Sequence, residues 1–409
     1  GSDENQMQAQ FHFSGGYGHS HRDNLNLTLW AHGREILPDL GYTWTQLRYW
    51  TSCTLGHNTV VVDRQDQLAT ESDGDLIWFF PDVAGVSVVE ADGRRGYRDI
   101  ESMARYRRMV VLVPVSERDA YVVDLFRVTG GSTHDWALHG DADEDTEAAC
   151  SVPLGEPRAN MLESGEEWVE PTIEGAVFNP YGLLRDMRSG SATDAFHVDF
   201  AYADRRDQGV RVHLLGCDPG SVWLGNSPSV RRMGTGSEGD MRKAYDFWMP
   251  HLLVRRTGAS PLASTFLAIE EPYADGPFLG SVTSLPLEPG GDDAIAVEVR
   301  HGQTTDTIIC TLDESPYPKR TTSTGVRLKG RLGIVRQENG AVTGGWLYEG
   351  ESLTAPGLDL TSPVSAYAGE ITSATRIADG DGQDALVTSS ELRAGDALRG
   401  TWMIVTHGD

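Results

Sequence analysis

Short runs in which hydrophobic and polar residues alternate recur along the chain. The clearest are LNLTLW at 25–30, VSVVE at 86–90, AYVVDLFRV at 120–128 and GVRVHLL at 209–215. Successive side chains of a strand point to opposite faces of a sheet, so a period of two predicts β-strands. Gly- and Asp-rich turns such as ADG at 91–93 separate the runs, and short turns favour antiparallel pairing. The pattern predicts an all-β fold.

A Pro- and Gly-rich segment at 287–293 (LEPGGDD) is the clearest break in the pattern, and strands resume after it at 295–300. We therefore expect residues 12–288 to form a large antiparallel β-sandwich, or supersandwich, and residues 289–409 to form a smaller β domain. The opening Gly1-Ser2 is typical of an expression scar. Residues 1–11 are accordingly expected to be a tag and leader segment.

The chain carries 60 acidic and 34 basic residues, for a formal net charge of -26. This charge repels nucleic acid and anionic membranes, so neither is an expected partner. No apolar run approaches the roughly 18–20 residues that span a bilayer, which gives no expectation of membrane insertion. An anionic sugar polymer would feel the same repulsion, but salt screens it beyond roughly 8–10 Å. Binding of such a polymer would therefore need arginines close to the site.

Candidate chemistry is concentrated between residues 12 and 67. In an extended segment, His19 and His21 of GGYGHSHRD would point to one face, since strand side chains alternate. The hairpin formed by 25–31 and 35–39 would return Asp39 toward them, and His57 opens the next predicted strand, HNTVVVD. Two imidazoles and a carboxylate make an open divalent-metal site, most often a zinc site. The HxH pair alone is a weak signal.

The stretches GHSHRDNLNLTLWAHGREILPDLGY (18–42) and GHNTVVVD (56–63) resemble the signature of heparinase II/III-like polysaccharide lyases. HDWALHG at 134–140 and the segment 251–273 are similar to later sandwich strands of these enzymes. The resemblance covers about residues 12–275. The remaining C-terminal part fits only as a generic β domain.

The resemblance implies cleavage of a uronic-acid-containing polysaccharide by β-elimination, with His19 as the proton-transfer residue. It also implies that His21, Asp39 and His57 bind a zinc ion whose role is mainly structural. Such lyases place an α/α toroid before the sandwich, and the toroid supplies further catalytic groups. We therefore expect a toroid partner in the same or a separate chain, and a secreted or periplasmic protein.

Four further residues near the signature are candidate contacts for the substrate. Arg22 and Arg48 could neutralise a sugar carboxylate, because guanidinium groups bind carboxylates in a bidentate manner. Tyr42 is a candidate phenolic acid, and Tyr17 a candidate for sugar stacking. Each of these residues could instead be an ordinary surface or strand side chain.

Two other functions stay open from the sequence. The sandwich could be a non-catalytic carbohydrate-binding or structural domain that keeps the zinc site for folding, because fold and motif do not guarantee activity. A zinc hydrolase is a weaker alternative, since no HExxH motif is present.

Overall fold

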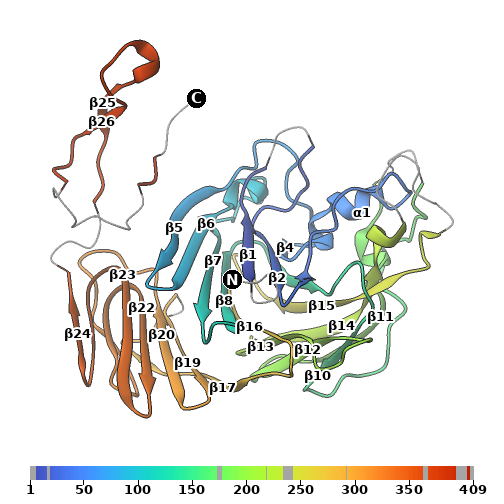
Figure 1. Ribbon diagram of the computed structural model, residues 1–409. Coiled ribbons are helices and arrows are strands. Elements are labelled where there is room, and N and C mark those ends of the chain that lie inside the picture. Colours follow the sequence, from blue (N-terminus) through green and yellow to red (C-terminus); the bar gives the residue numbers. More distant parts are fainter. Residues whose placement is uncertain are drawn as a thin grey trace. The chain divides into compact units, whose positions relative to one another are not determined.

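The computed structural model describes residues 6–15, 19–172, 177–217, 219–233, 243–291, 293–362, 367–392 and 403–405 (Figure 1). The chain splits into two compact units, the first of which reaches Leu279 and the second of which spans Gly280–Met403. The boundary predicted after Glu288 lies inside the second unit, because strand β17 (Leu279–Ser284) pairs in the sheet of that unit. All named strand pairs are antiparallel, which confirms the predicted all-β fold.

The described residues of the first unit form three sheets. The largest has the order β10-β12-β13-β16-β8-β7-β6-β5, the second has the order β11-β14-β15-β9-β4, and the third has the order β1-β2-β3. The strands are β1 (Met7–His12), β2 (Asn26–Ala31), β3 (Arg34–Leu37), β4 (Val60–Val62), β5 (Asp75–Val83), β6 (Val86–Asp92), β7 (Arg105–Pro114), β8 (Ala120–Thr129), β9 (Thr133–His139), β10 (Thr146–Cys150), β11 (Arg185–Ser191), β12 (Phe196–Tyr202), β13 (Gly209–Leu214), β14 (Ser221–Pro228), β15 (Trp248–Thr257) and β16 (Ala263–Tyr273).

Helical segments of the first unit are short. They are α1 (Arg48–Ser52) and the 3-10 turns η2 (Thr54–Gly56), η3 (Arg94–Tyr97), η4 (Pro180–Gly182) and η5 (Val230–Met233). In the part of the chain that the structure describes, no helix has the length and apolar character needed to cross a bilayer.

The second unit is also built from strands. One sheet has the order β17-β19-β20-β22-β21-β18 and is extended by β23 and β24, and β25 pairs with β26 in a separate hairpin. The elements after β17 are β18 (Leu287–Glu288), β19 (Ile295–His301), β20 (Thr304–Cys310), β21 (Arg320–Thr322), β22 (Arg327–Glu338), β23 (Ala341–Ala355), β24 (Leu358–Thr361), β25 (Ile371–Thr375), η7 (Ile377–Asp379) and β26 (Ala385–Thr388).

The five-stranded sheet of the first unit is buried on both faces. Val60 and Val62 of β4 pack in a core shared with the eight-stranded sheet, whereas Val61 packs in a second core on the opposite face. A strand that is covered on both sides has a continuous hydrophobic sequence, which accounts for the run of three valines. Trp50 of α1 and Leu55 of η2 belong to the second core. This packing holds the segment just before His57 against the sheet.

Strand β1 corrects one prediction. Residues 7–11 were expected to belong to a leader segment, but Met7–His12 pairs with β2 in regular register. The inward side chains of Met7, Ala9 and Phe11 pack against the main core. The prediction was wrong because only three hydrophobic residues alternate there, between glutamines, and their burial depends on contacts from distant parts of the chain.

Two buried charges link the eight-stranded sheet to the loops above it. Arg108 of β7 and Asp124 of β8 are fully buried and form two parallel hydrogen bonds of 2.7 Å. The Nη1 atom of Arg108 also donates to the carbonyls of Leu25 at 2.7 Å and Asn58 at 2.6 Å. The guanidinium therefore connects the start of β2 with the start of β4.

A third buried ionisable group lies near this pair. Glu270 of β16 is fully buried, and neither carboxyl oxygen has a hydrogen-bond partner among the described residues. Burial, together with the negative charge of Asp124, raises the pKa of Glu270 from 4.5 to about 8. Glu270 is accordingly protonated in the folded protein at neutral pH.

The raised pKa predicts a loss of stability as the pH rises from 4.5 to about 8. The folded state keeps a proton that the unfolded chain releases above its own pKa of 4.5. The resulting stabilisation is complete below that value and is lost as the pH rises through about 8. Glu270→Gln removes the titrating group, so its melting temperature should fall less than that of the wild type across this range. Parallel melting curves for the two proteins would contradict the assignment, and Glu101→Gln, at an exposed position, is the control.

Candidate functional site

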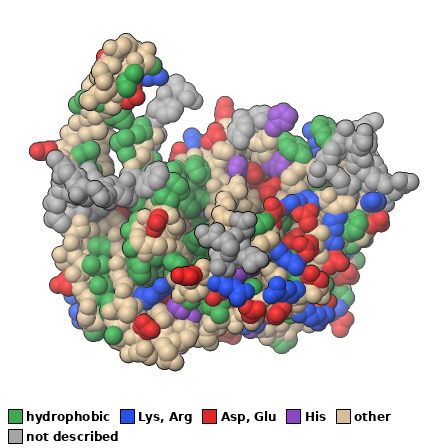
Figure 2. Space-filling model, in the orientation of Figure 1, with side chains coloured by type: hydrophobic (Ala, Val, Ile, Leu, Met, Phe, Trp, Pro, Cys, Tyr) green, Lys and Arg blue, Asp and Glu red, His purple; other side chains and the backbone are tan. Residues whose placement is uncertain are grey.

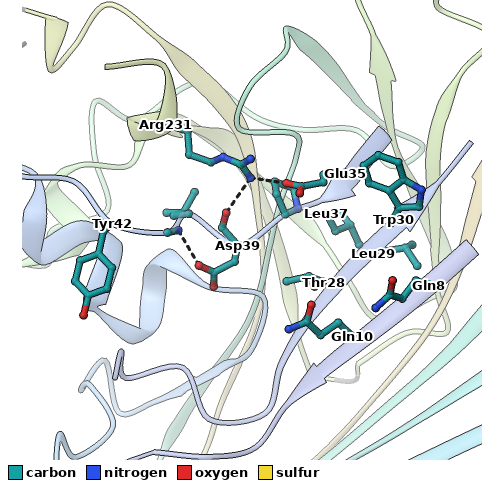
Figure 3. A pocket seen from close by; sticks show the side chains of 13 residues that line it. Gln8, Gln10, Thr28, Leu29, Trp30, Glu35, Leu37, Asp39, Tyr42 and Arg231 are labelled. Carbon is teal, nitrogen blue, oxygen red and sulfur yellow. Dashed lines mark hydrogen bonds and ion pairs between the residues drawn. The ribbon is translucent and has the colours of Figure 1, made fainter. Parts of the chain in front are cut away.

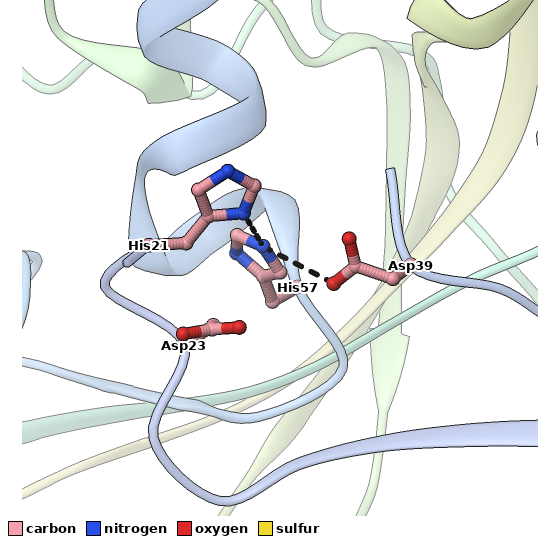
Figure 4. A group of neighbouring side chains, drawn as sticks. All are labelled: His21, Asp23, Asp39 and His57. Atoms are coloured by element: carbon pink, nitrogen blue, oxygen red, sulfur yellow. Dashed lines mark hydrogen bonds and ion pairs between the residues drawn. The ribbon is translucent and has the colours of Figure 1, made fainter. Parts of the chain in front are cut away.

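Four side chains from distant parts of the sequence converge on one point (Figure 4). One ligand atom each from His21, Asp23, Asp39 and His57 can be chosen so that all four atoms lie within 4.8 Å of one another. The Nε2 atom of His57 is 3.3 Å from Nδ1 of His21 and 3.5 Å from Oδ2 of Asp39. We refer to these four residues as the His–Asp cluster. Figure 2 shows histidine side chains gathered at the top of its view, with acidic side chains beside them.

The segments that carry the cluster are loops at the ends of strands. His21 and Asp23 lie between β1 and β2, Asp39 follows β3, and His57 follows η2. The prediction that His19 and His21 share the face of a strand was wrong. Residues 19–22 are not in a strand, and His19 has a left-handed φ of 71°, which interrupts the alternation of side chains.

The orientation of His57 is fixed by the backbone. Its Nδ1 atom lies 2.8 Å from the carbonyl oxygen of Cys53, between α1 and η2. A carbonyl oxygen only accepts hydrogen bonds, so Nδ1 carries the proton and Nε2 turns its lone pair toward the cluster. The side chain is completely buried. His57 is thus prepared to act as a metal ligand.

Asp39 is oriented by two donors. The backbone N–H of Gly41 donates to Oδ1 at 2.7 Å, and the side-chain amide of Asn26 donates to Oδ2 at 3.1 Å. Burial by itself would raise the pKa of Asp39, but the electrostatic interaction with the His57 imidazole and the Gly41 hydrogen bond outweigh it and lower the pKa overall. The carboxylate form, which binds metals, is therefore favoured.

A buried asparagine ties these loops together. The side-chain amide of Asn58 donates to the carbonyl of Leu27 at 3.0 Å, and its oxygen accepts from the backbone N–H of His139 at 2.9 Å. Its own backbone N–H donates to Oδ1 of Asn26 at 2.9 Å. The chain of contacts from Asn58 through Asn26 to Asp39 joins the residue after His57 to the opposite side of the cluster. Sequence reasoning did not identify either asparagine.

Asp23 is the cluster member that sequence reasoning missed. It lies two residues after His21 in the HSHRD stretch, and this i, i+2 spacing of a carboxylate was the available signal. The Nε2 atom of His12, the last residue of β1, approaches Oδ1 of Asp23 to 3.4 Å. Asp23 itself is buried, so it adds a second carboxylate to the predicted set of ligands.

The donor set is suited to a divalent cation. Burial and the electrostatic interaction with the neighbouring His57 imidazole lower the pKa of His21, which favours the neutral, metal-binding form of the imidazole. Two imidazole nitrogens and two carboxylates suit a tetrahedral ion such as Zn²⁺. Bringing the buried carboxylate of Asp23 close to the half-buried one of Asp39 is unfavourable unless a cation or donors compensate their charge. The residues present therefore fit a metal of this type.

The two predicted catalytic residues lie beside the cluster. The Tyr42 hydroxyl donates to the backbone carbonyl of His19 at 2.9 Å, and their rings are 6.3 Å apart. The Tyr42 ring is also 4.9 Å from the ring of His21. His19 is exposed. The structure thus brings a solvent-accessible imidazole and a phenol together at the edge of the cluster.

The predicted substrate contacts lie outside the cluster. The Nε atom of Arg22 is 3.8 Å from Oδ2 of Asp66. Arg48 is exposed and stacks over the ring of Trp44 at 4.2 Å, and 47% of the Trp44 surface is accessible. Tyr17 falls outside the described residues, so its prediction is not addressed by the structure.

Comparisons with known proteins found one family model and several similar solved structures. Residues 8–191 match the family model described as "Heparinase II/III-like, C-terminal". Similar solved structures include a heparinase III gene product (13% identity, TM-score 0.46, 75% of this chain and 38% of that one). They also include the heparan sulfate lyase HepC from Pedobacter heparinus (12%, 0.47, 74% and 38%) and heparinase III (16%, 0.44, 72% and 37%). The chain spans less than two fifths of each of these structures, and no curated protein sequence matches it.

Asp23 offers a direct test of the cluster. Removing one ligand from a site of this kind should weaken metal binding by at least tenfold, because even residues that only support a ligand contribute on the order of 10- to 100-fold. We expect Asp23→Ala to show this loss of Zn²⁺ affinity in a titration against a competing chelator, and Glu101→Gln to bind like the wild type. Equal affinity in the two variants would remove Asp23 from the site.

Proposed function

Residues 8–191 of this chain belong to the heparinase II/III-like C-terminal family, and from this membership we propose that the chain is the sandwich part of a polysaccharide lyase. The proposed substrate is a uronic-acid-containing polysaccharide, which is cleaved by β-elimination. The observation that carries the proposal is the pairing of exposed His19 with Tyr42 at the edge of the partly buried, pre-oriented His–Asp cluster.

The proposed reaction moves one proton to the protein and one from it. A base removes the proton on the sugar carbon next to the carboxylate, and the electron pair left behind forms a carbon–carbon double bond. The bond to the glycosidic oxygen then breaks, and an acid protonates that oxygen. An imidazole can exchange protons near neutral pH, so His19 suits the role of base or acid. The Tyr42 hydroxyl is the candidate for the complementary role.

The His–Asp cluster has a separate, supporting role in this proposal. His21, Asp23, Asp39 and His57 would hold zinc, and a bound zinc would supply cross-linking of three loops rather than chemistry at the sugar. The Tyr42 hydroxyl also holds the backbone of His19. Fixing those loops would keep His19 at a constant position relative to the substrate, which is a condition for efficient proton transfer.

The sugar carboxylate requires a cation, because elimination builds negative charge beside it. Arg48 is the better of the two predicted candidates, since it is exposed and its guanidinium stacks on Trp44. The charge of Arg22 is already partly balanced by Asp66. We propose that Arg48 contacts the reacting or the neighbouring uronate, with Arg22 in a secondary role.

The chain covers only 38% of each of two similar solved structures. The proposal therefore includes a partner domain. We propose that an α/α toroid, in the same or a separate chain, completes the substrate-binding site. The natural setting proposed for such a lyase is the periplasm or the exterior of the cell.

The alternative is a carbohydrate-binding or structural sandwich without catalysis. His57 and Asn58 are completely buried, and this burial is the observation that favours the non-catalytic alternative. Residues built so tightly into the core could be kept for folding alone.

Two histidine variants separate catalysis from metal binding. Activity is followed as ultraviolet absorbance of the unsaturated uronate product, on hyaluronan, heparan sulfate, alginate and ulvan, with this chain and with its full-length natural form. Loss of general acid or base catalysis costs about 10²- to 10⁴-fold in rate, so His19→Ala should lose that much activity and keep its zinc and melting temperature. His57→Ala should lose zinc and melt at a lower temperature.

Two results would contradict the proposal. Full activity of His19→Ala would remove that residue from the reaction. Absence of product from the full-length form on all of these polymers would favour the non-catalytic alternative.

A further inference from the structure

A groove of about 520 Å³ lies beside the cluster, on the outer face of the three-stranded sheet (Figure 3). The strands alternate, so their apolar side chains enter the core and their polar ones face outward. The polar and aromatic side chains that line the groove include Gln8 and Gln10 of β1, Thr28 and Trp30 of β2, Glu35 of β3, and Arg231 of η5. Asp39 and Tyr42 line the same groove. The groove and the proposed catalytic edge therefore share residues.

Strand register connects the groove to the cluster. Gln8 lies opposite Trp30, Gln10 opposite Thr28, and His12 opposite Asn26. The last pair touches the cluster, because His12 approaches Asp23 and Asn26 donates to Asp39. Along β2, the four steps from Asn26 to Trp30 span about 13 Å at roughly 3.3 Å per residue. The outer face thus offers a straight path, long enough for two sugar rings, that ends at the site.

The side chains along this path are suited to sugar hydroxyl groups. Gln8 and Gln10 are exposed and Thr28 and Trp30 are half-buried. Among the described residues, no hydrogen-bond partner is found for their side chains. Amides both donate and accept, and a hydroxyl does the same. An indole ring offers a rigid apolar face with one polar N–H, which matches the mixed character of a pyranose ring.

The charges of the groove oppose an anionic ligand. Arg231 is already committed, because its guanidinium contacts Glu35 and Asp143 at 2.6 Å and the Asp39 carbonyl at 3.2 Å. Its single positive charge is thus shared by two carboxylates, so these three side chains carry a net negative charge. A sulfate or a second carboxylate placed here would be repelled.

We propose that the outer face of the β1-β2-β3 sheet binds an uncharged sugar unit of the polysaccharide, next to the uronate that reacts, with Trp30 as its stacking platform. This inference rests on the proposed function for the identity of the polymer. The binding surface itself can be tested without any reaction. Trp30 and Gln10 are then specificity-determining residues outside the chemistry.

The test uses two disaccharides of similar size, the uncharged N,N′-diacetylchitobiose and the anionic digalacturonate. Binding to the chain is measured by titration of intrinsic fluorescence and by saturation-transfer NMR. Loss of an aromatic contact should weaken binding about tenfold, so Trp30→Ala should bind diacetylchitobiose that much more weakly. Gln10→Ala, at an exposed position, should weaken it several-fold and guards against a folding defect in Trp30→Ala. Trp346→Ala, a half-buried tryptophan of the second unit, is the matched control and should bind like the wild type.

Three outcomes would overturn the inference: no binding of diacetylchitobiose to the wild type, equal binding by the wild type, Trp30→Ala and Gln10→Ala, or an equal loss of digalacturonate binding in Trp30→Ala. Elimination activity is measured separately on the same proteins. If product forms and Trp30→Ala leaves KM unchanged, the lyase proposal stands and the proposal that the groove binds a sugar is contradicted. If diacetylchitobiose binding depends on Trp30 but no polymer yields product, the sugar-binding groove stands and the lyase proposal is contradicted.

Discussion

The buried contact of Arg108 with two backbone carbonyls is the constraint on which the site depends. Asp124 balances the charge of the guanidinium, and the remaining donor reaches the carbonyls of Leu25 and Asn58. Removing one partner of such a pair leaves an uncompensated buried charge, which costs about 3–5 kcal/mol. The eight-stranded sheet therefore positions the loops that contain Leu25 and Asn58 through Arg108, without the need for a metal.

Leu25 illustrates what this contact achieves. Its side chain is fully buried, yet its backbone has a left-handed φ of 64°. A residue with a Cβ atom pays about 1–2 kcal/mol for that conformation, so surrounding contacts must impose it. The hydrogen bond from Arg108 to the Leu25 carbonyl is one of them. The turn it stabilises directs the chain from Asp23 of the cluster into β2.

The sequence was sufficient for the periodic features and insufficient for the long-range ones. Alternation located β6, β8 and β13 closely, and the hairpin of β2 and β3 explained the return of Asp39. Asp23 was not predicted as a ligand, because its loop is oriented by left-handed residues and not by strand alternation. The roles of Asn58 and Arg108 were not predicted, because they depend on partners tens of residues away, such as His139 and Leu25. No local pattern encodes such contacts.

The metal centre is tested most directly by the coordination of zinc bound to the intact chain, obtained by X-ray absorption spectroscopy or from a crystal structure with zinc. The structure leads us to expect two imidazole nitrogens and two carboxylate oxygens, supplied by His21, Asp23, Asp39 and His57. A sulfur ligand, a shell without imidazole, or an ion bound elsewhere would contradict a metal centre built from these loops.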